Sequence, residues 1–199
     1  SLIMISLYTG YAHAGINPGN YDEFQKIEND GNNAIISDGG EYTFTNGAEL
    51  TSNITKPIID ANNLNEDMVI NVGNKDNKIN FDLKLDNDKG SVISNTISNL
   101  TINATNTSVN IDGNYKYGID FSDKNNNDAF NTVVKIAGNE NTDFIINGNG
   151  FYAINFNPWY DNAKLEIASN NFYIGNKNES SSFNTGIYFS QYNEEAMSS

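Results

Sequence analysis

Short apolar runs, separated by turn-forming residues, recur along most of the chain. Between residues 133 and 156 there are three such runs, made mostly of β-branched and aromatic residues, with Asn, Gly, Asp and Thr between them. Runs of this length and composition are typical of β-strands and are too short for helices. The stretch therefore predicts three strands, at residues 133–136, 144–146 and 151–156.

The same three-run pattern occurs five times. Clear copies cover residues 100–121 and 165–189, on either side of the central copy. A looser copy consists of residues 68–72, 79–85 and 92–97, and the loosest consists of residues 34–36, 42–44 and 58–61. The isoleucines that anchor the first runs are almost evenly spaced along the sequence: Ile36, Ile70, Ile102, Ile136 and Ile167.

This period predicts a solenoid in which one repeat forms one coil. A repeat of three strands is too small to bury its own apolar face, so it must stack on its neighbours. We therefore expect an all-β fold, a parallel β-helix of about five coils of three strands. The expected inward stacks are Ile70, Ile102, Ile136 and Ile167 in one column and Ile119, Ile154 and Ile187 in another. The alternative is a chance similarity produced by a composition rich in Asn and Ile.

Residues 1–14 have the character of the end of a secretory signal. An apolar core at residues 2–7 is followed by Ala12, His13 and Ala14, which fits the small-residue pattern of a cleavage site. The initiator Met and a basic leading segment are missing, so the chain would begin inside that signal. The alternative is that this stretch forms the first strand of the fold.

Residues 15–31 are the predicted N-terminal cap. Asn20 is suited to cap a short helix that would carry Tyr21, Phe24 and Ile27 on one face. Such a helix would cover the open end of the first coil, and the alternative is a disordered leader. Residues 32–199 would then form the β-helix, which we expect to continue beyond the last residue.

Composition and charge narrow the class of partner. The chain has 199 residues, normally one domain, and with 38% hydrophobic residues it is too apolar for a disordered protein. A net charge of −14 with no Arg leaves no basic stripe for phosphates, so we expect no nucleic-acid partner. The same charge is repelled by an anionic membrane, and no apolar stretch is long enough for a transmembrane helix. We therefore expect no membrane insertion by this segment.

The chain resembles the N-terminal passenger region of a Gram-negative autotransporter, a protein of type V secretion. The resemblance rests on the Ala12-His13-Ala14 ending, the Ile-anchored period, the Asn and Gly turns and the absence of Cys. It implies a right-handed, single-stranded β-helix, export through the periplasm to the cell surface, an outer-membrane barrel downstream and a role in adhesion. Two features differ from the family. The coils, whose length is given by the spacing of the isoleucines, are longer than the coils usual in such passengers, and the chain contains no barrel.

Catalytic groups are scarce. His13 is the only histidine, it lies in the signal-like segment, and Cys and Arg do not occur. The chain therefore lacks the residues for a Ser-His-Asp or Cys-His triad and for a His/Cys zinc site, and we expect neither enzymatic activity nor a cofactor. A glycosidase that uses two carboxylates is the alternative, with Asp120 and Asp123 opposite Asp161.

Two stretches resemble calcium-binding loops. Asp86 and Asp88 begin one such stretch, but its glycine comes one place early and Glu is missing at the twelfth position. Asp123, Asn125 and Asn127 space oxygen ligands well in the other, which lacks the turn glycine. Polar turns without calcium are the alternative for both.

The loops after the third runs, at residues 122–129, 157–162 and 190–195, are the longest, and loops on one side of a solenoid commonly carry binding. We predict a patch there that binds a glycan or protein of a host or bacterial surface. It consists of Trp159, Tyr160, Asp161, Asp123 and Glu194. Alternatively, Trp159 and Tyr160 cover the side of a coil. The functional hypothesis is thus a surface-exposed or secreted adhesin-type solenoid without catalysis. The alternatives are a tailspike-like polysaccharide depolymerase and a purely structural surface spacer.

Overall fold

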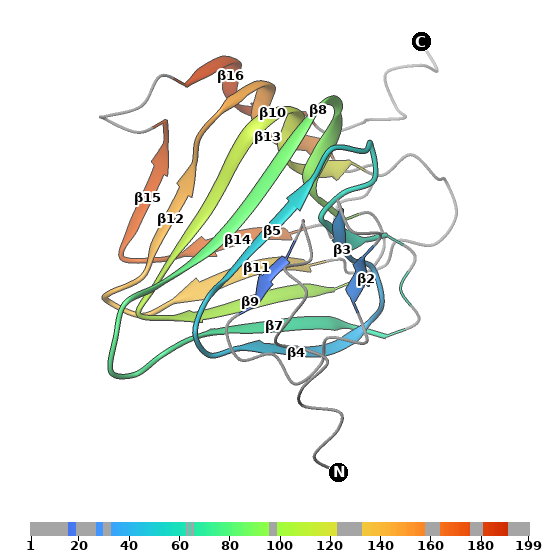
Figure 1. Ribbon diagram of the computed structural model, residues 1–199. Coiled ribbons are helices and arrows are strands. Elements are labelled where there is room, and N and C mark those ends of the chain that lie inside the picture. Colours follow the sequence, from blue (N-terminus) through green and yellow to red (C-terminus); the bar gives the residue numbers. More distant parts are fainter. Residues whose placement is uncertain are drawn as a thin grey trace, which may run out of the picture.

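A computed structural model shows the protein as a parallel β-helix (Figure 1). It describes residues 16–18, 27–29, 33–62, 64, 66–95, 99–122, 133–157, 164–175 and 181–190. These residues form sixteen strands and no helix. The strands build three faces around one core, and each coil of the chain crosses the faces in the same order.

Face 1 is a five-stranded parallel sheet made of β4 (Gly40–Phe44), β7 (Met68–Gly73), β9 (Leu100–Thr105), β11 (Val133–Gly138) and β14 (Lys164–Ala168). Face 2 consists of β5 (Ala48–Ser52), the first parts of β8 (Ile79–Asn95) and β10 (Thr107–Ser122), β12 (Asp143–Ile146) and β15 (Asn171–Ile174). Face 3 consists of β3 (Ala34–Ile36), β6 (Ile59–Ala61), the last parts of β8 and β10, β13 (Asn149–Asn157) and β16 (Ser182–Phe189). From β4 to β14 the chain makes four complete turns, and β15 and β16 add faces 2 and 3 of a fifth rung.

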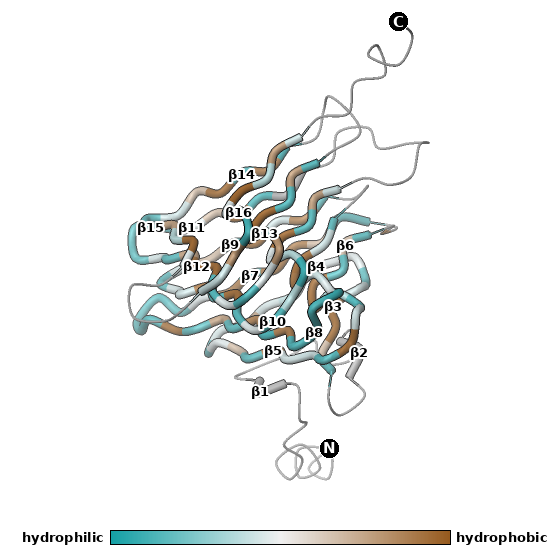
Figure 2. The backbone as a smooth tube through the Cα atoms, turned by 90° about the horizontal axis from the view of Figure 1, so that it is seen from above, coloured by the Kyte–Doolittle hydropathy of each residue, from teal (hydrophilic) through white to brown (hydrophobic). Residues whose placement is uncertain are grey.

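Apolar residues alternate with polar ones along the strands, as the colours of the tube in Figure 2 indicate. The residues at alternate positions are buried. Ile70, Ile102, Ile136 and Ile167 pair in sequence across face 1, which confirms the first predicted stack. The first three are fully buried, and Ile167 in the last rung is partly buried. Because every rung contributes the same positions, the core is one continuous column.

The second predicted stack is also in register and is longer than predicted. Ile119, Ile154 and Ile187 pair along face 3, and the column extends back through Ile93 and Ile59. Ile59 in turn pairs with Ile36, which the sequence pattern had placed in the other column of isoleucines.

The first copy of the repeat was therefore assigned wrongly. Ile36 lies in β3 on face 3, ahead of the first rung, and the position that it was expected to hold on face 1 belongs to Tyr42. The true first coil is β4, β5 and β6, and β5 was not predicted. In β5, Glu49 and Thr51 separate the buried residues from one another. This alternation of buried and less buried positions is nevertheless typical of a strand with one face in the core.

The N-terminal end carries two short antiparallel strands. β1 (Ile16–Pro18) pairs with β5, and β2 (Ile27–Asn29) pairs with β3, both antiparallel. Ile27, expected on the helix, is thus in a strand, whereas residues 19–26 lie outside the described part of the chain. The predicted signal remnant at residues 1–14 also lies outside it.

Two stacked glycines form the corner between faces 2 and 3. Gly113 has a φ of 113° and Gly148 a φ of 91°, values that L side chains rarely adopt. A Cβ at Gly113 would lie 2.0 Å from the carbonyl oxygen of Leu85 in the preceding rung, and one at Gly148 would lie 2.3 Å from that of Gly113. The rungs can stack closely at this corner only because both positions lack a side chain.

Candidate functional site

The predicted loop patch lies outside the described residues. This applies to Trp159, Tyr160, Asp161, Asp123 and Glu194. The structure does show where the three loops begin: Ser122 pairs in register with Asn157, and the backbone N–H of Ser190 donates to the carbonyl of Phe156 at 3.0 Å. The loops thus leave face 3 at adjacent positions, and the patch itself stays a prediction.

One of the two calcium candidates is described. Asp86 and Asp88 lie within β8, where it passes from face 2 to face 3, and Asp86 Oδ1 accepts a hydrogen bond of 2.8 Å from Asn114 Nδ2. No group of three His, Cys, Asp or Glu side chains that could hold a metal ion occurs in the described ranges. The other candidate, which includes Asn125 and Asn127, falls in the undescribed segment 123–132.

Asp120, considered above for a glycosidase, is a buried residue of face 3. Its carboxylate accepts hydrogen bonds of 2.8 Å from Ser122 Oγ and from Asn155 Nδ2, and Ser91 Oγ lies at 3.5 Å. These partners lie in three successive rungs, so the carboxylate ties the rungs together. The other two members of the suggested catalytic group are not described.

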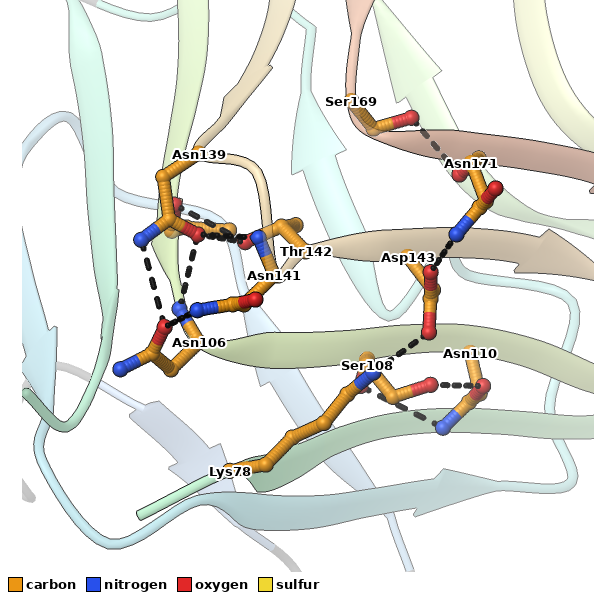
Figure 3. A network of polar contacts seen from close by, with 11 residues as sticks. Lys78, Asn106, Ser108, Asn110, Asn139, Asn141, Thr142, Asp143, Ser169 and Asn171 are labelled. Atoms are coloured by element: carbon orange, nitrogen blue, oxygen red, sulfur yellow. Dashed lines mark hydrogen bonds and ion pairs between the residues drawn. The ribbon is translucent and has the colours of Figure 1, made fainter. Parts of the chain in front are cut away.

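A polar groove lies at the corner between faces 1 and 2. We call it the corner groove; it has a volume of about 510 Å³. Figure 3 shows much of it from close by, with side chains from several successive rungs side by side. The residues that line the groove are Lys75, Asp76, Lys78, Asn106, Glu140, Asn141, Asp143, Asn170 and Asn171.

Asn106 organises the turns beneath the groove. Its φ of 48° is left-handed, a conformation that Asn tolerates better than most residues. Its side-chain N–H groups donate to the carbonyls of Asn74 and Lys75 in the preceding rung, both at 3.0 Å. Its backbone N–H donates to Asn139 Oδ1 in the following rung at 3.1 Å. Asn106 thus connects three stacked turns through its side chain and its backbone N–H.

The next turn continues the same network (Figure 3). Asn141 Nδ2 donates to Asn106 Oδ1 at 3.0 Å, and the buried Thr142 hydroxyl lies 2.9 Å from Asn139 Oδ1. The carbonyl of Thr142 then accepts the backbone N–H of Asn170 at 3.0 Å in the last rung. Because buried backbone N–H and C=O groups need hydrogen-bond partners, these contacts satisfy the polar groups of the turns and hold the floor of the groove in place.

An ion pair crosses the groove. Lys78 Nζ lies 2.5 Å from Asp143 Oδ2, two rungs along the solenoid, and Asn171 Nδ2 donates to Asp143 Oδ1 at 2.7 Å. The Lys78 contact is the main reason why the pKa of Asp143 lies below its ordinary value. Partial burial acts in the opposite direction, and the Asn171 hydrogen bond lowers the pKa further. Asp143 is therefore ionised at neutral pH.

Several groups at the groove remain available to a ligand. The Lys75 ammonium group makes no ion pair or hydrogen bond within the described part of the chain, and Asp76, Glu140 and Asn170 are exposed. A smaller hollow of about 200 Å³ on face 1 shares Lys75 with the groove. The available groups include both donors and acceptors, which suits a ligand with many hydroxyl groups.

Sequence reasoning missed this groove, because it was directed to the longer loops after the third runs. A signal was nevertheless present. The turns between the first and second strands each carry an asparagine at or next to their first position, and these asparagines recur with nearly the period of the isoleucines: Asn74, Asn106, Asn139 and Asn170.

No helix long and apolar enough to cross a membrane occurs among the residues that the structure describes. Comparisons with protein-family models, with curated proteins and with solved structures found no match to this chain.

Proposed function

We propose that the protein is a surface-exposed or secreted solenoid of the adhesin type, which binds a surface glycan in its corner groove without catalysis. The observation that carries the proposal is the groove itself, an open polar surface built on a rigid stack of turns. Export across the outer membrane and a barrel downstream belong to the same proposal, and they rest on the resemblance of the sequence to autotransporter passengers.

The chemistry of the groove favours a glycan over an apolar ligand. Asn170 offers an amide with both donors and acceptors, Lys75 offers three donors, and Asp76 and Glu140 offer acceptors. Planar amide and carboxylate groups can each bind two neighbouring hydroxyls of a sugar. Rungs about 4.8 Å apart repeat such groups along the axis, so a chain of sugars lying along the groove can contact several rungs.

The same groove brings three carboxylates together, and this is the observation that favours the enzyme alternative. A glycosidase needs one carboxylic acid that stays protonated and a second that is ionised. Asp143 is held ionised by Lys78, so it suits only the second role. Asp76 and Glu140 are both exposed, so the groove does not exclude water from them as the active site of a glycosidase would. We therefore favour binding over hydrolysis.

A glycan array with the purified chain, followed by affinity measurements on the best glycan, tests the proposal. The variant Glu140→Ala with Asn170→Ala removes two exposed groove side chains and should weaken binding at least tenfold. Glu49→Ala with Asn53→Ala is the matched control, since it changes the same residue types on exposed positions of the first rung. The control should bind as the wild type does, and all proteins should keep the same β-sheet circular dichroism.

Three results would count against this function. Binding that survives the groove variant but is lost in Trp159→Ala with Tyr160→Ala would move the site to the loops of face 3. Binding to no glycan at all would favour a purely structural spacer. Cleavage of the bound polysaccharide by the wild type, abolished by Asp143→Asn, would establish the enzyme instead.

A further inference from the structure

We propose that the corner groove prefers glycans with acetamido groups, and that one acetamido group lies in the hollow beside the groove on face 1. The inference rests on the proposed function, because it names the class of sugar that the groove binds. The hollow has a volume of about 200 Å³ and shares Lys75 with the groove. Thr105, which also lines the hollow, directly precedes Asn106 of the groove. A sugar in the groove can therefore place a substituent in the hollow.

The register of face 1 builds the hollow. Thr43, Asn71 and Asn103 are consecutive partners, so their outward side chains form a row across three rungs. Two positions further along the strands, Gly73 pairs with Thr105. Gly73 has no side chain, and a Cβ there would lie 2.4 Å from the carbonyl oxygen of Thr105. The hollow thus opens beside a row of polar side chains, at a position that must stay glycine.

The row of amides leaves one acceptor available. Asn71 Nδ2 donates to Glu41 Oε1 at 2.6 Å, and Asn103 Nδ2 donates to Asn71 Oδ1 at 2.9 Å. The next position of the row is Ala137, which has no polar side chain to continue it. Asn103 Oδ1 therefore accepts no hydrogen bond from the part of the chain that the structure describes. It is suited to accept an N–H group of a ligand.

Donors and apolar groups complete the lining of the hollow. The Lys75 ammonium group and the Thr105 hydroxyl make no hydrogen bond with other described residues. Phe44 and Val72, two residues of the core, also line the hollow. An acetamido group has an N–H, a carbonyl oxygen and a methyl group. It therefore matches the acceptor, the donors and the apolar residues of the hollow together.

Other substituents of sugars match fewer of these groups. A hydroxyl group has no apolar part to contact Phe44 and Val72, and the methyl group of a deoxy sugar has no N–H for Asn103. A carboxylate cannot donate to Asn103 either, and it would be repelled by a chain with a net charge of −14. A protonated amine would meet the like charge of Lys75. The hollow therefore favours sugars that are N-acetylated.

Matched oligosaccharides test the inference: oligomers of N-acetylglucosamine and of N-acetylgalactosamine, each against the hexose oligomer of the same linkage. The wild type should bind the N-acetylated member of at least one pair at least tenfold more tightly. Asn103→Ala removes the acceptor and Thr105→Leu fills the hollow. Each should abolish most of this preference and leave the affinity for the hexose oligomer unchanged.

Asn99→Ala is the matched control, since Asn99 donates to Asp67 Oδ1 at 3.0 Å in the way that Asn103 donates to Asn71, but lies outside the hollow. It should keep the full preference, and all variants should keep the β-sheet circular dichroism of the wild type. A preference that survives both Asn103→Ala and Thr105→Leu would overturn the inference.

The outcomes separate this inference from the proposed function. Glu140→Ala with Asn170→Ala should weaken the binding of both members of a pair by the same factor, because it changes the groove and leaves the hollow intact. Equal affinity of the wild type for both members, with binding lost in this groove variant, would overturn the inference and retain glycan binding in the groove. Binding to no glycan would overturn both.

Discussion

Two adjacent isoleucines in β12 allow the inward and outward positions of the solenoid to be tested against each other. Ile146 points into the core and is fully buried, whereas Ile145 points outward and is only partly buried. Replacing Ile by Ala removes three carbon atoms, worth about 2.4 kcal/mol at ~0.8 kcal/mol for each buried group. At Ile146 the loss leaves a cavity in a column fixed on both sides by Ile111 and Ile174, which adds about 1 kcal/mol or more.

We therefore expect Ile146→Ala to lower the free energy of unfolding by about 3–4 kcal/mol and Ile145→Ala to lower it by about 1 kcal/mol or less. Urea denaturation followed by circular dichroism in the β-sheet region measures both. The two variants have the same composition and lie in the same strand, so each serves as the control for the other. Equal losses, or a greater loss at Ile145, would show that the alternation of buried and exposed positions in β12 is wrong.

Two further predictions concern the corners of the solenoid. Because the pKa of Asp143 is lowered in the folded state, its ionised form contributes stability that is present above the unfolded value of about 3.9 and is lost as the pH falls through the lower folded value. Asp143→Asn should therefore cost about 0.5–1 kcal/mol at pH 7 and progressively less below about pH 4, as measured by urea denaturation at several pH values. Gly113→Ala places a Cβ 2.0 Å from a carbonyl oxygen at a positive φ and should cost at least about 3 kcal/mol. Gly186→Ala meets only ordinary contacts at 3.7 Å and should cost much less, and similar melting temperatures for these two variants would contradict the proposed corner geometry.

The sequence predicted the isoleucine columns of the solenoid well, because the residues that recur with the repeat are the same residues that are buried in the core. Ile102 and Ile136 are fully buried and in register, since a stacked coil repeats each inward position after one turn. The pattern failed where another residue type filled the equivalent position. Tyr42 takes the place of an isoleucine on face 1, and Ile36 happens to lie one period before Ile70 although it belongs to another face.

The corner groove was harder to find for a different reason. Asn accounts for 38 of the 199 residues, so the regular spacing of Asn106 and Asn139 does not stand out from the background. Their role depends on a left-handed turn and on contacts between rungs, and neither is visible in a hydrophobic pattern. The ion pair of Lys78 with Asp143 joins residues 65 positions apart, and only the stacking of coils brings them together.

The distance between the first and last rungs of face 1 tests the in-register stack most directly. Glu41 and Glu166 occupy the same outward position at the two ends of a ladder that runs through Val69, Thr101 and Lys135. Four steps of about 4.8 Å place their Cα atoms about 19 Å apart, although most of the chain separates them in the sequence. Spin labels on Glu41→Cys with Glu166→Cys, diluted with unlabelled chain, should give one narrow distribution near that distance by electron–electron double resonance. A distribution centred beyond about twice that distance would contradict the parallel β-helix.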